Sequence, residues 1–93
     1  MIYAVELDPK AHSALFALVE REAEFVSFHL FKLAESPREL SDRSTLPRGM
    51  EYCFRLAGAD EADAIWFTVR WQYKREEIIY VDGIVRSKFA PPA

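Results

Sequence analysis

Several features that define common protein classes are scarce in this sequence of 93 residues. Its single cysteine, Cys53, excludes an internal disulfide and a cysteine-based zinc site, and it fits a reducing cytoplasm. No apolar run approaches the roughly 20 residues that a membrane-spanning helix needs. With only three glycines, the chain has no P-loop and no glycine-rich dinucleotide motif. Residues 1–10 lack the basic flank and long apolar core of a signal peptide, so we expect a strand there.

Positive charge is in short supply as well. The formal net charge is -3, which argues against a non-specific nucleic-acid binder, because such proteins are usually strongly basic. The charge is uneven along the chain, since residues 57–69 hold three acids and no base, whereas residues 70–93 hold five bases and three acids. This local excess of arginine and lysine fits either a binding face or an ordinary solvated surface.

Apolar side chains, by contrast, suffice for one packed domain over residues 1–93. Hydrophobic residues make up 51% of the chain and aromatic residues 14%. Asp8 and Pro9 are typical of a helix start, and neither glycine nor proline occurs from Lys10 to Ser36. One straight helix over that span would be about 40 Å long, whereas a domain of this size is about 30 Å across. We therefore predict a break near residues 20–24, with two helices packed as a hairpin and the second ending at Pro37.

The rest of the chain, after a polar connection at residues 38–50, is patterned for strands. Residues 65–73 alternate most clearly, and Phe67, Val69, Trp71 and Tyr73 should point into the core. Shorter runs at 2–7, 51–56 and 78–85 predict three further strands, with turns at 58–61 and 74–77. The predicted fold class is α+β, in the order β-α-α-β-β-β, with the helical hairpin covering one face of a roughly four-stranded sheet. The exposed arginines then lie on the uncovered side.

Three segments in this order resemble the RelE/ParE superfamily of bacterial toxins from toxin–antitoxin pairs. They are residues 7–11 (LDPKA), 33–38 (LAESPR) and 46–56 (LPRGMEYCFRL), the last followed by two long strands. The RelE branch has a similar entry to its second strand. The resemblance covers nearly the whole chain and implies a small antitoxin that wraps the toxin surface. RelE-like members cut messenger RNA in the ribosomal decoding site, and ParE-like members poison DNA gyrase.

The resemblance also assigns candidate site residues. Arg55 stands where the family has a basic residue on the second strand, Arg70 is the arginine nearest to the basic position opening the third strand, and Arg86 matches the basic residue after the last strand. These three are the candidate catalytic residues, because RNA cleavage by a 2′-hydroxyl needs cations to stabilise the growing phosphate charge. The candidate substrate-binding residues are Arg48, Trp66 and Lys88.

The family pattern is not fully matched. A second basic position falls on Ala57, and the C-terminal tyrosine aligns with Phe89, which has no hydroxyl. The frequent Gly-His or Gly-Arg pair becomes Gly83-Ile84. The RNase site implied by the resemblance is therefore incomplete.

Ordinary structural roles compete with these assignments. Arg55 and Arg70 can bind phosphate oxygens, or they can pair with acids such as Asp82. Trp66, on the face opposite the core, can contact a partner. The histidines, His12 and His29, stand at no metal-ligand spacing, so we expect neither a metal site nor a cofactor.

Three functions stay open at this point: an RNA endonuclease, a toxin that acts on a protein such as DNA gyrase, and a non-toxic interaction module of the same fold. A toxin would act in the cytoplasm, away from membranes, with an antitoxin as its partner. The second helix is apolar over a wide arc that includes Phe25, Phe28 and Phe31. Either its own hairpin covers this arc, or a partner or second subunit does.

Overall fold

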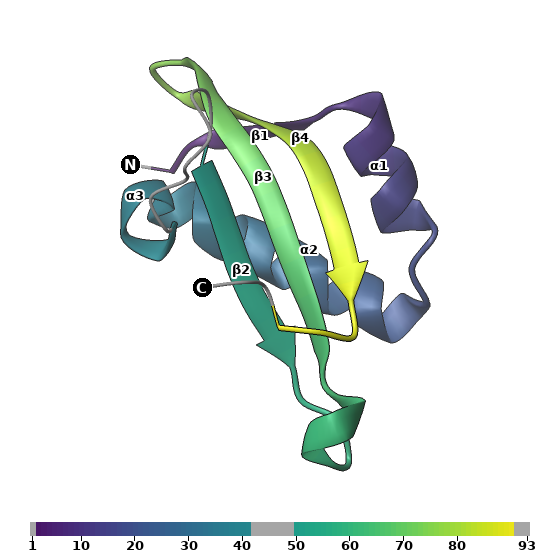
Figure 1. Cartoon of the computed structure of the whole chain (residues 1–93). Helices are drawn as coiled ribbons and strands as arrows, with labels where there is room; N and C mark the ends of the chain where they lie inside the picture. Colours follow the sequence, from purple (N-terminus) through teal and green to yellow (C-terminus); the bar gives the residue numbers. More distant parts are fainter. Residues whose placement is uncertain (1, 42–49, 91–93) are drawn as a thin grey trace.

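A computed structural model describes residues 2–41 and 50–90, which form helices packed against a four-stranded sheet (Figure 1). The strands are β1 (Ala4–Leu7), β2 (Met50–Leu56), β3 (Ile65–Arg75) and β4 (Ile78–Ser87), and their spatial order is β1-β4-β3-β2. β1 runs parallel to β4, and the other neighbours are antiparallel. The α+β class and the predicted order of the main elements are confirmed.

The long glycine-free segment forms two helices, as expected, but the break lies earlier than predicted. Helix α1 spans Pro9–Phe16, and Asp8 caps it by accepting a hydrogen bond from the Lys10 backbone nitrogen at 3.0 Å. Helix α2 spans Glu20–Glu35, so the break falls at residues 17–19 and not at 20–24. The acids at the start of α2 explain the difference, because carboxylates in a first turn interact favourably with the positive end of the helix dipole.

Two further boundaries differ from expectation. Pro37 does not open an extended connection but starts a short helix, α3 (Pro37–Leu40), in the first position that proline tolerates well. The rest of the predicted polar connection, residues 42–49, lies outside the described residues. The β3–β4 turn is shorter than predicted, with only Glu76 and Glu77 between the strands.

One face of the sheet and the inner sides of the helices form the core. Phe67, Val69 and Trp71 of β3 are fully buried, as their alternation predicts. Tyr73, which was expected to join them, is 39% exposed because it lies near the end of β3. The other large residues that are fully buried are Val26, Leu33, Ile79 and Val81.

The helices are arranged so that the opposite face of the sheet carries no helix from the described part of the chain. Figure 1 shows α2 passing behind the sheet and α1 lying beside β4. We call the face without helices the open face. None of the helices formed by residues 2–41 and 50–90 is both long and apolar enough to cross a membrane.

Candidate functional site on the open face of the sheet

Residues of the open face come from alternate positions of β2, β3 and β4. Arg55 lies directly opposite Trp66 across the β2–β3 pair, and Arg70 lies opposite Gly83 across the β3–β4 pair. Side chains of successive strand residues point to opposite faces, so the buried Phe67 and Val69 place Trp66 and Arg70 on the open side. Two of the three predicted catalytic arginines therefore share this face.

One end of the open face combines a cation with an aromatic ring. The guanidinium carbon of Arg55 lies 5.9 Å from the centroid of the Trp66 ring, within cation–π range. Lys88, exposed, follows Ser87, which is the residue opposite Trp66 on β4. Arg55, Trp66 and Lys88, all predicted site residues, are therefore brought to the same end.

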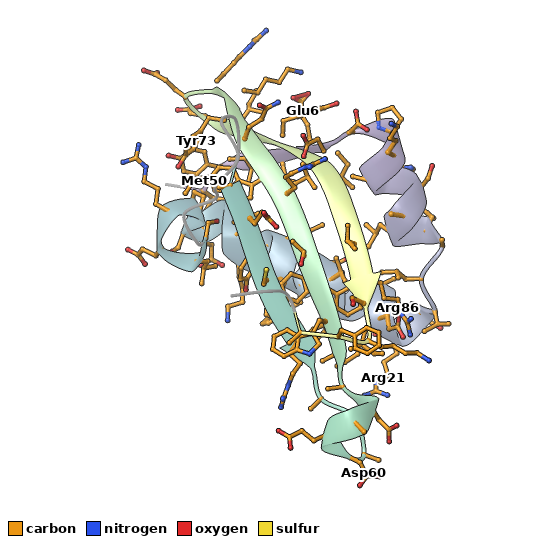
Figure 2. All side chains as sticks on the ribbon, viewed as in Figure 1. Glu6, Arg21, Met50, Asp60, Tyr73 and Arg86 are labelled. Atoms are coloured by element: carbon orange, nitrogen blue, oxygen red, sulfur yellow. The ribbon has the colours of Figure 1, made fainter. Side chains whose placement is uncertain are left out.

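This end is not uniformly basic. A hollow of about 200 Å³ beside Arg55 is lined by the β2–β3 connection, including Asp60 and Glu61. Figure 2 shows Asp60 at the tip of that connection, far from Glu6 at the other end of the sheet. An anion at Arg55 is therefore favoured on the Trp66 side of the guanidinium and disfavoured on the acidic side.

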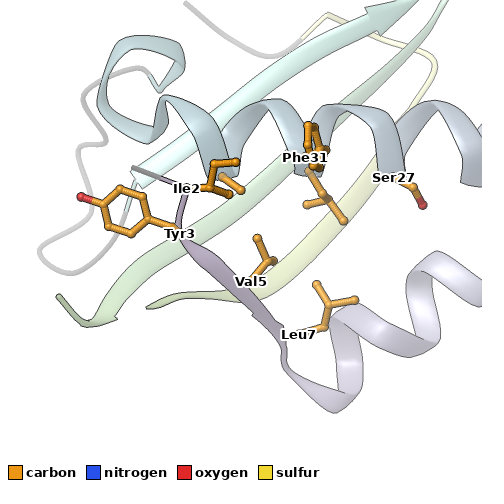
Figure 3. A pocket seen from close by; sticks show the side chains of 8 residues that line it. Ile2, Tyr3, Val5, Leu7, Ser27 and Phe31 are labelled. Atoms are coloured by element: carbon orange, nitrogen blue, oxygen red, sulfur yellow. The ribbon is translucent and has the colours of Figure 1, made fainter. Parts of the chain in front are cut away.

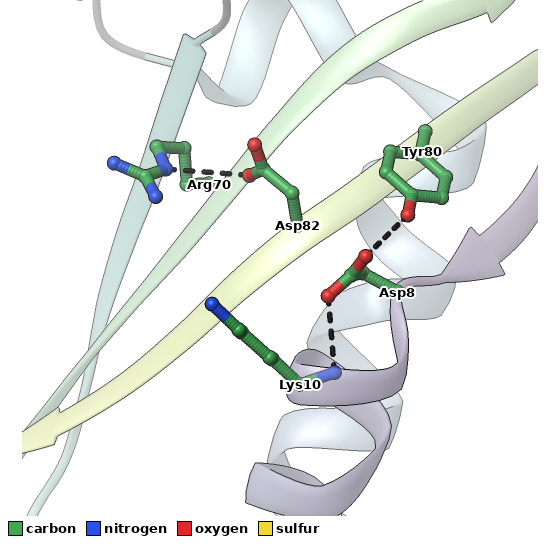
Figure 4. A network of polar contacts seen from close by, with 5 residues as sticks. All are labelled: Asp8, Lys10, Arg70, Tyr80 and Asp82. Atoms are coloured by element: carbon green, nitrogen blue, oxygen red, sulfur yellow. Dashed lines mark hydrogen bonds and ion pairs between the residues drawn. The ribbon is translucent and has the colours of Figure 1, made fainter.

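Arg70 belongs to a second group, closer to the middle of the face. It lies four positions along β3 from Trp66, a distance of about 13 Å in an extended strand. Its Nε donates to Asp82 Oδ1 at 3.3 Å (Figure 4). Asp82 sits at a β-bulge, because the register shifts between the pairs Trp71–Val81 and Arg70–Gly83. The ordinary alternative for Arg70, pairing with an acid such as Asp82, is thus realised.

The adjoining end of the face carries an acid–phenol pair that the sequence analysis missed. Tyr80 Oη donates to Asp8 Oδ1 at 2.5 Å. This bond, followed by the one from the Lys10 backbone, lowers the pKa of Asp8, and the same bond to Asp8 raises the pKa of Tyr80. Lys74 closes the group, with Nζ 3.0 Å from Glu6 Oε2 and 5.7 Å from the Tyr80 ring centroid.

No local pattern in the sequence could have revealed this pair, because Asp8 and Tyr80 are 72 positions apart. They meet through the parallel pairing of β1 with β4, whose register places Leu7 beside Val81. Predicting that pairing requires the tertiary arrangement of the first and last strands.

Arg86, the third candidate catalytic residue, is not on the open face. It lies opposite the buried Phe67, on the helix side of the sheet. Its Nε and Nη2 donate to the two carboxylate oxygens of Glu22, at 2.7 and 3.1 Å. Figure 2 shows Arg86 near the start of α2. This bidentate ion pair ties β4 to α2.

The remaining assignments have plain outcomes. Arg48 lies outside the described residues. Phe89 is 81% exposed and its backbone nitrogen donates to Ser87 Oγ at 3.0 Å. Cys53 is half-buried beside Thr68, with Sγ 3.5 Å from Oγ1. Residues 2–41 and 50–90 contain no group of three metal-ligating side chains.

Comparisons with known proteins find likeness in structure but not in sequence. No family model and no curated protein matches the sequence. The free Escherichia coli toxin RelE, solved as a double arginine-to-alanine mutant, matches with a TM-score of 0.64 and 17% identity, over 90% of this chain and 82% of that chain. A chain of the intact E. coli RelBE toxin–antitoxin complex matches with a TM-score of 0.63 and 20% identity, over 88% of this chain and 93% of that chain. The protein therefore has a RelE-like fold.

Proposed function

We propose that this chain is the toxin of a toxin–antitoxin pair and that a cognate antitoxin holds it inactive. The observation that carries the proposal is the likeness of nearly the whole chain to free RelE and to a chain of the RelBE complex. The open face, with exposed Arg55 and Arg70, gives such a toxin a surface for its target. A target such as messenger RNA or DNA gyrase places its action in the cytoplasm.

The first form of this proposal is an mRNA endonuclease. Arg55 and Trp66 would hold a nucleotide, because a guanidinium binds phosphate oxygens and an indole ring stacks on a base. Lys88, at the same end, and Arg48 would add phosphate contacts. Arg70 would stabilise the phosphate charge that grows as the 2′-oxygen attacks phosphorus and the bond to the 5′-oxygen breaks.

Proton transfer in that reaction needs an acceptor and a donor. Asp82 is a carboxylate beside Arg70, at 3.3 Å, and can take the proton of the attacking 2′-hydroxyl. The carboxylic acid so formed can return a proton to the leaving 5′-oxygen, which balances the step. Arg70 must then exchange its contact with Asp82 for one with the phosphate.

The second form is a toxin that binds a protein target such as DNA gyrase, or a silent module of the same fold. The ion pairs favour it, since Arg70 and Arg86 are each already matched by a carboxylate. Phe89 favours it too, because a phenyl ring supplies no proton. In this form the open face serves as a contact surface without chemistry.

Induction of the chain alone in a bacterium tests the proposal. We expect growth to stop, and for the endonuclease the 5′ ends of messages should map to new internal cuts. Arg55→Ala and Arg70→Ala should each relieve the arrest. Arg75→Ala is the matched control, because Arg75 is an exposed arginine at the far end of β3, about 30 Å along the strand from Trp66.

The outcomes separate the two forms. Arrest with intact messages and damaged DNA would assign a protein target such as gyrase. Arrest that neither arginine substitution relieves would show that the site is placed wrongly. A soluble, folded chain that leaves growth unchanged would overturn the toxin proposal itself.

A further inference from the structure

The outer side of α2 has an apolar centre flanked by charges. Phe28 and Phe31 are 58% and 57% exposed, although both lie in the middle of a helix that packs on the sheet with its other side. Four charged residues extend this exposed surface toward both helix ends, at spacings of three, four and seven residues that keep them on one side. They are Arg21, Glu24, Lys32 and Glu35. We call these six residues the α2 outer face.

We propose that the α2 outer face binds the same face of a second copy of this chain, with the two helices antiparallel. The inference is independent of the toxin function, since it concerns the helix side of the molecule and not the open face of the sheet. A homodimer is favoured because the order of charges along α2 is complementary to the same order read in the opposite direction.

The complementarity follows from the positions along the helix axis. With a rise of 1.5 Å per residue, Arg21 and Glu35 lie about 10.5 Å from Phe28 on opposite sides, and Glu24 and Lys32 lie about 6 Å from it. A two-fold axis at Phe28 therefore sets Arg21 of one copy against Glu35 of the other. It also sets Glu24 against Lys32. Two-fold symmetry repeats each contact, which gives four opposite-charge pairs around two stacked phenylalanines.

Other orientations do not give this match. A parallel pair in register would place each charge against its own kind, which is unfavourable. The row Arg21–Phe28–Glu35 is spaced by seven residues, about two turns, and so runs nearly along the helix axis. The four pairs therefore form together when the two helices lie nearly antiparallel, at the crossing angle of about 20° that is usual in four-helix bundles.

Neighbouring features support an interface at this place. Phe31 forms one wall of an apolar hollow of about 410 Å³ between α2 and β1, lined also by Ile2 and Val5 (Figure 3). A second hollow of about 370 Å³ lies between α2 and α3, beside Phe28 and Leu40. Lys32 Nζ is 5.6 Å from the Phe28 ring centroid, so this cation already lies at the centre of the face. Arg21 makes a long, exposed contact of 3.4 Å to the Ala57 carbonyl and keeps further donors.

Sedimentation velocity over a range of concentrations, at low salt, tests the dimer by charge reversal. Glu24→Lys sets lysine against lysine twice per dimer, and Lys32→Glu sets glutamate against glutamate twice. Each variant alone should raise the dimer Kd about tenfold. An equimolar mixture of the two should restore the dimer, because both contacts are then of opposite charge. Glu76→Lys, at the β3–β4 turn, is the control with the same change of charge, and it should dimerise like the unmodified chain.

The variants change exposed side chains, so circular dichroism should show an unaltered fold. Phe28→Ser should abolish the dimer without affecting the sheet, and added salt should weaken it by screening the four pairs. A chain that stays monomeric throughout, or a dimer that ignores both charge reversals, would overturn the proposal. A monomer whose α2 outer face is covered only by an antitoxin would assign the face to that partner and also overturn it.

Discussion

The two faces of β3 follow the same backbone yet differ in almost every physical respect. On the helix side, Phe67, Val69 and Trp71 are completely buried. On the open side, Trp66 is half-buried and Arg70 is exposed. The covered face therefore holds the apolar contacts that stabilise the fold, and the open face holds charge and hydrogen-bonding groups that contribute little to stability. Substitutions on the covered face are thus expected to change the stability of the protein, whereas substitutions of neighbouring residues on the open face should mainly change its function.

The largest expected effect is a cavity on the covered face. Phe67→Ala should lower the free energy of unfolding by about 3–5 kcal/mol, because a fully buried aromatic side chain is lost. Trp66→Ala, one residue away on the open face, should cost about 1 kcal/mol through its cation–π contact with Arg55. Urea unfolding of both variants measures the difference. Equal losses would show that the two faces are not as distinct as their burial indicates.

A smaller effect is expected from the one polar atom of Trp71. Its Nε1 donates to Ser41 Oγ at 2.8 Å, from a ring that is otherwise buried in the core. Ser41→Ala should destabilise the protein by about 1–3 kcal/mol, because the buried N–H loses its acceptor. In a Trp71→Phe background the same serine substitution should cost almost nothing. The double-mutant cycle isolates this hydrogen bond, and a serine effect that persists with phenylalanine would assign Ser41 another role.

The third prediction concerns His29, which packs against the covered face of the sheet and should make the stability of the protein depend on pH. The ring stacks on Phe54 at 4.1 Å between centroids, and Nδ1 lies 2.5 Å from Tyr52 Oη. Burial, and then the charge of Lys32, lower the pKa of His29 below its ordinary value of 6.5. Near and below pH 6.5 the unfolded chain consequently binds more protons at His29 than the folded chain does. The contribution of neutral His29 to the free energy of unfolding is therefore fully present above pH 6.5 and is lost as the pH falls below it.

Unfolding experiments at several pH values check this sign. One proton gives a slope of at most about 1.4 kcal/mol per pH unit, and the partial exposure of His29 keeps the effect well below that limit. His29→Gln should flatten the dependence below about pH 6.5, where the imidazole of the unfolded chain begins to bind a proton. The same substitution at the exposed His12 controls for the loss of a histidine as such. Unchanged pH dependence in His29→Gln would contradict the assignment.

The smallest expected effect is on the open face itself. The Arg70–Asp82 pair is half exposed, so its coupling free energy should be about 0.5 kcal/mol or less and should fall with added salt. A double-mutant cycle of Arg70→Ala and Asp82→Ala, measured by urea unfolding, gives this value. A coupling of several kcal/mol would mean that the pair is structural, and the open face would then lose its interpretation as a surface free to bind a target.

Strand alternation explains how much of this could be predicted. The spacing of Phe67, Val69 and Trp71 identified the buried face of β3, and therefore also the open position of Arg70. The position of Arg86 could not be obtained in this way. Counting by twos from Ile79 and Val81 places Arg86 on the open side, but the bulge at Asp82 inserts one residue and moves it to the helix side.

The helices, too, could be predicted only in part: their number was predicted, and the position of the break between them was not. The prediction of two helices in the glycine-free segment is confirmed, but the assumed width of about 30 Å was too small, because the molecule extends 40 Å along its longest axis. The polar residues at 20–22 were interpreted as the break, whereas they form the first turn of α2. Their carboxylates stabilise a helix start, so the chain turns just before them, at residues 17–19.

By itself the sequence determined the α+β class, the order of the elements, the buried side of β3 and the helix start at Asp8, because each depends on local periodicity or on neighbouring residues. Tertiary structure alone decided which strands became neighbours, and with them the meeting of Asp8 and Tyr80, the ion pair of Arg86 with Glu22 and the exposure of the α2 outer face. Contacts between distant segments depend on how strands pair and on which apolar surfaces are covered, and no local spacing in the chain encodes either.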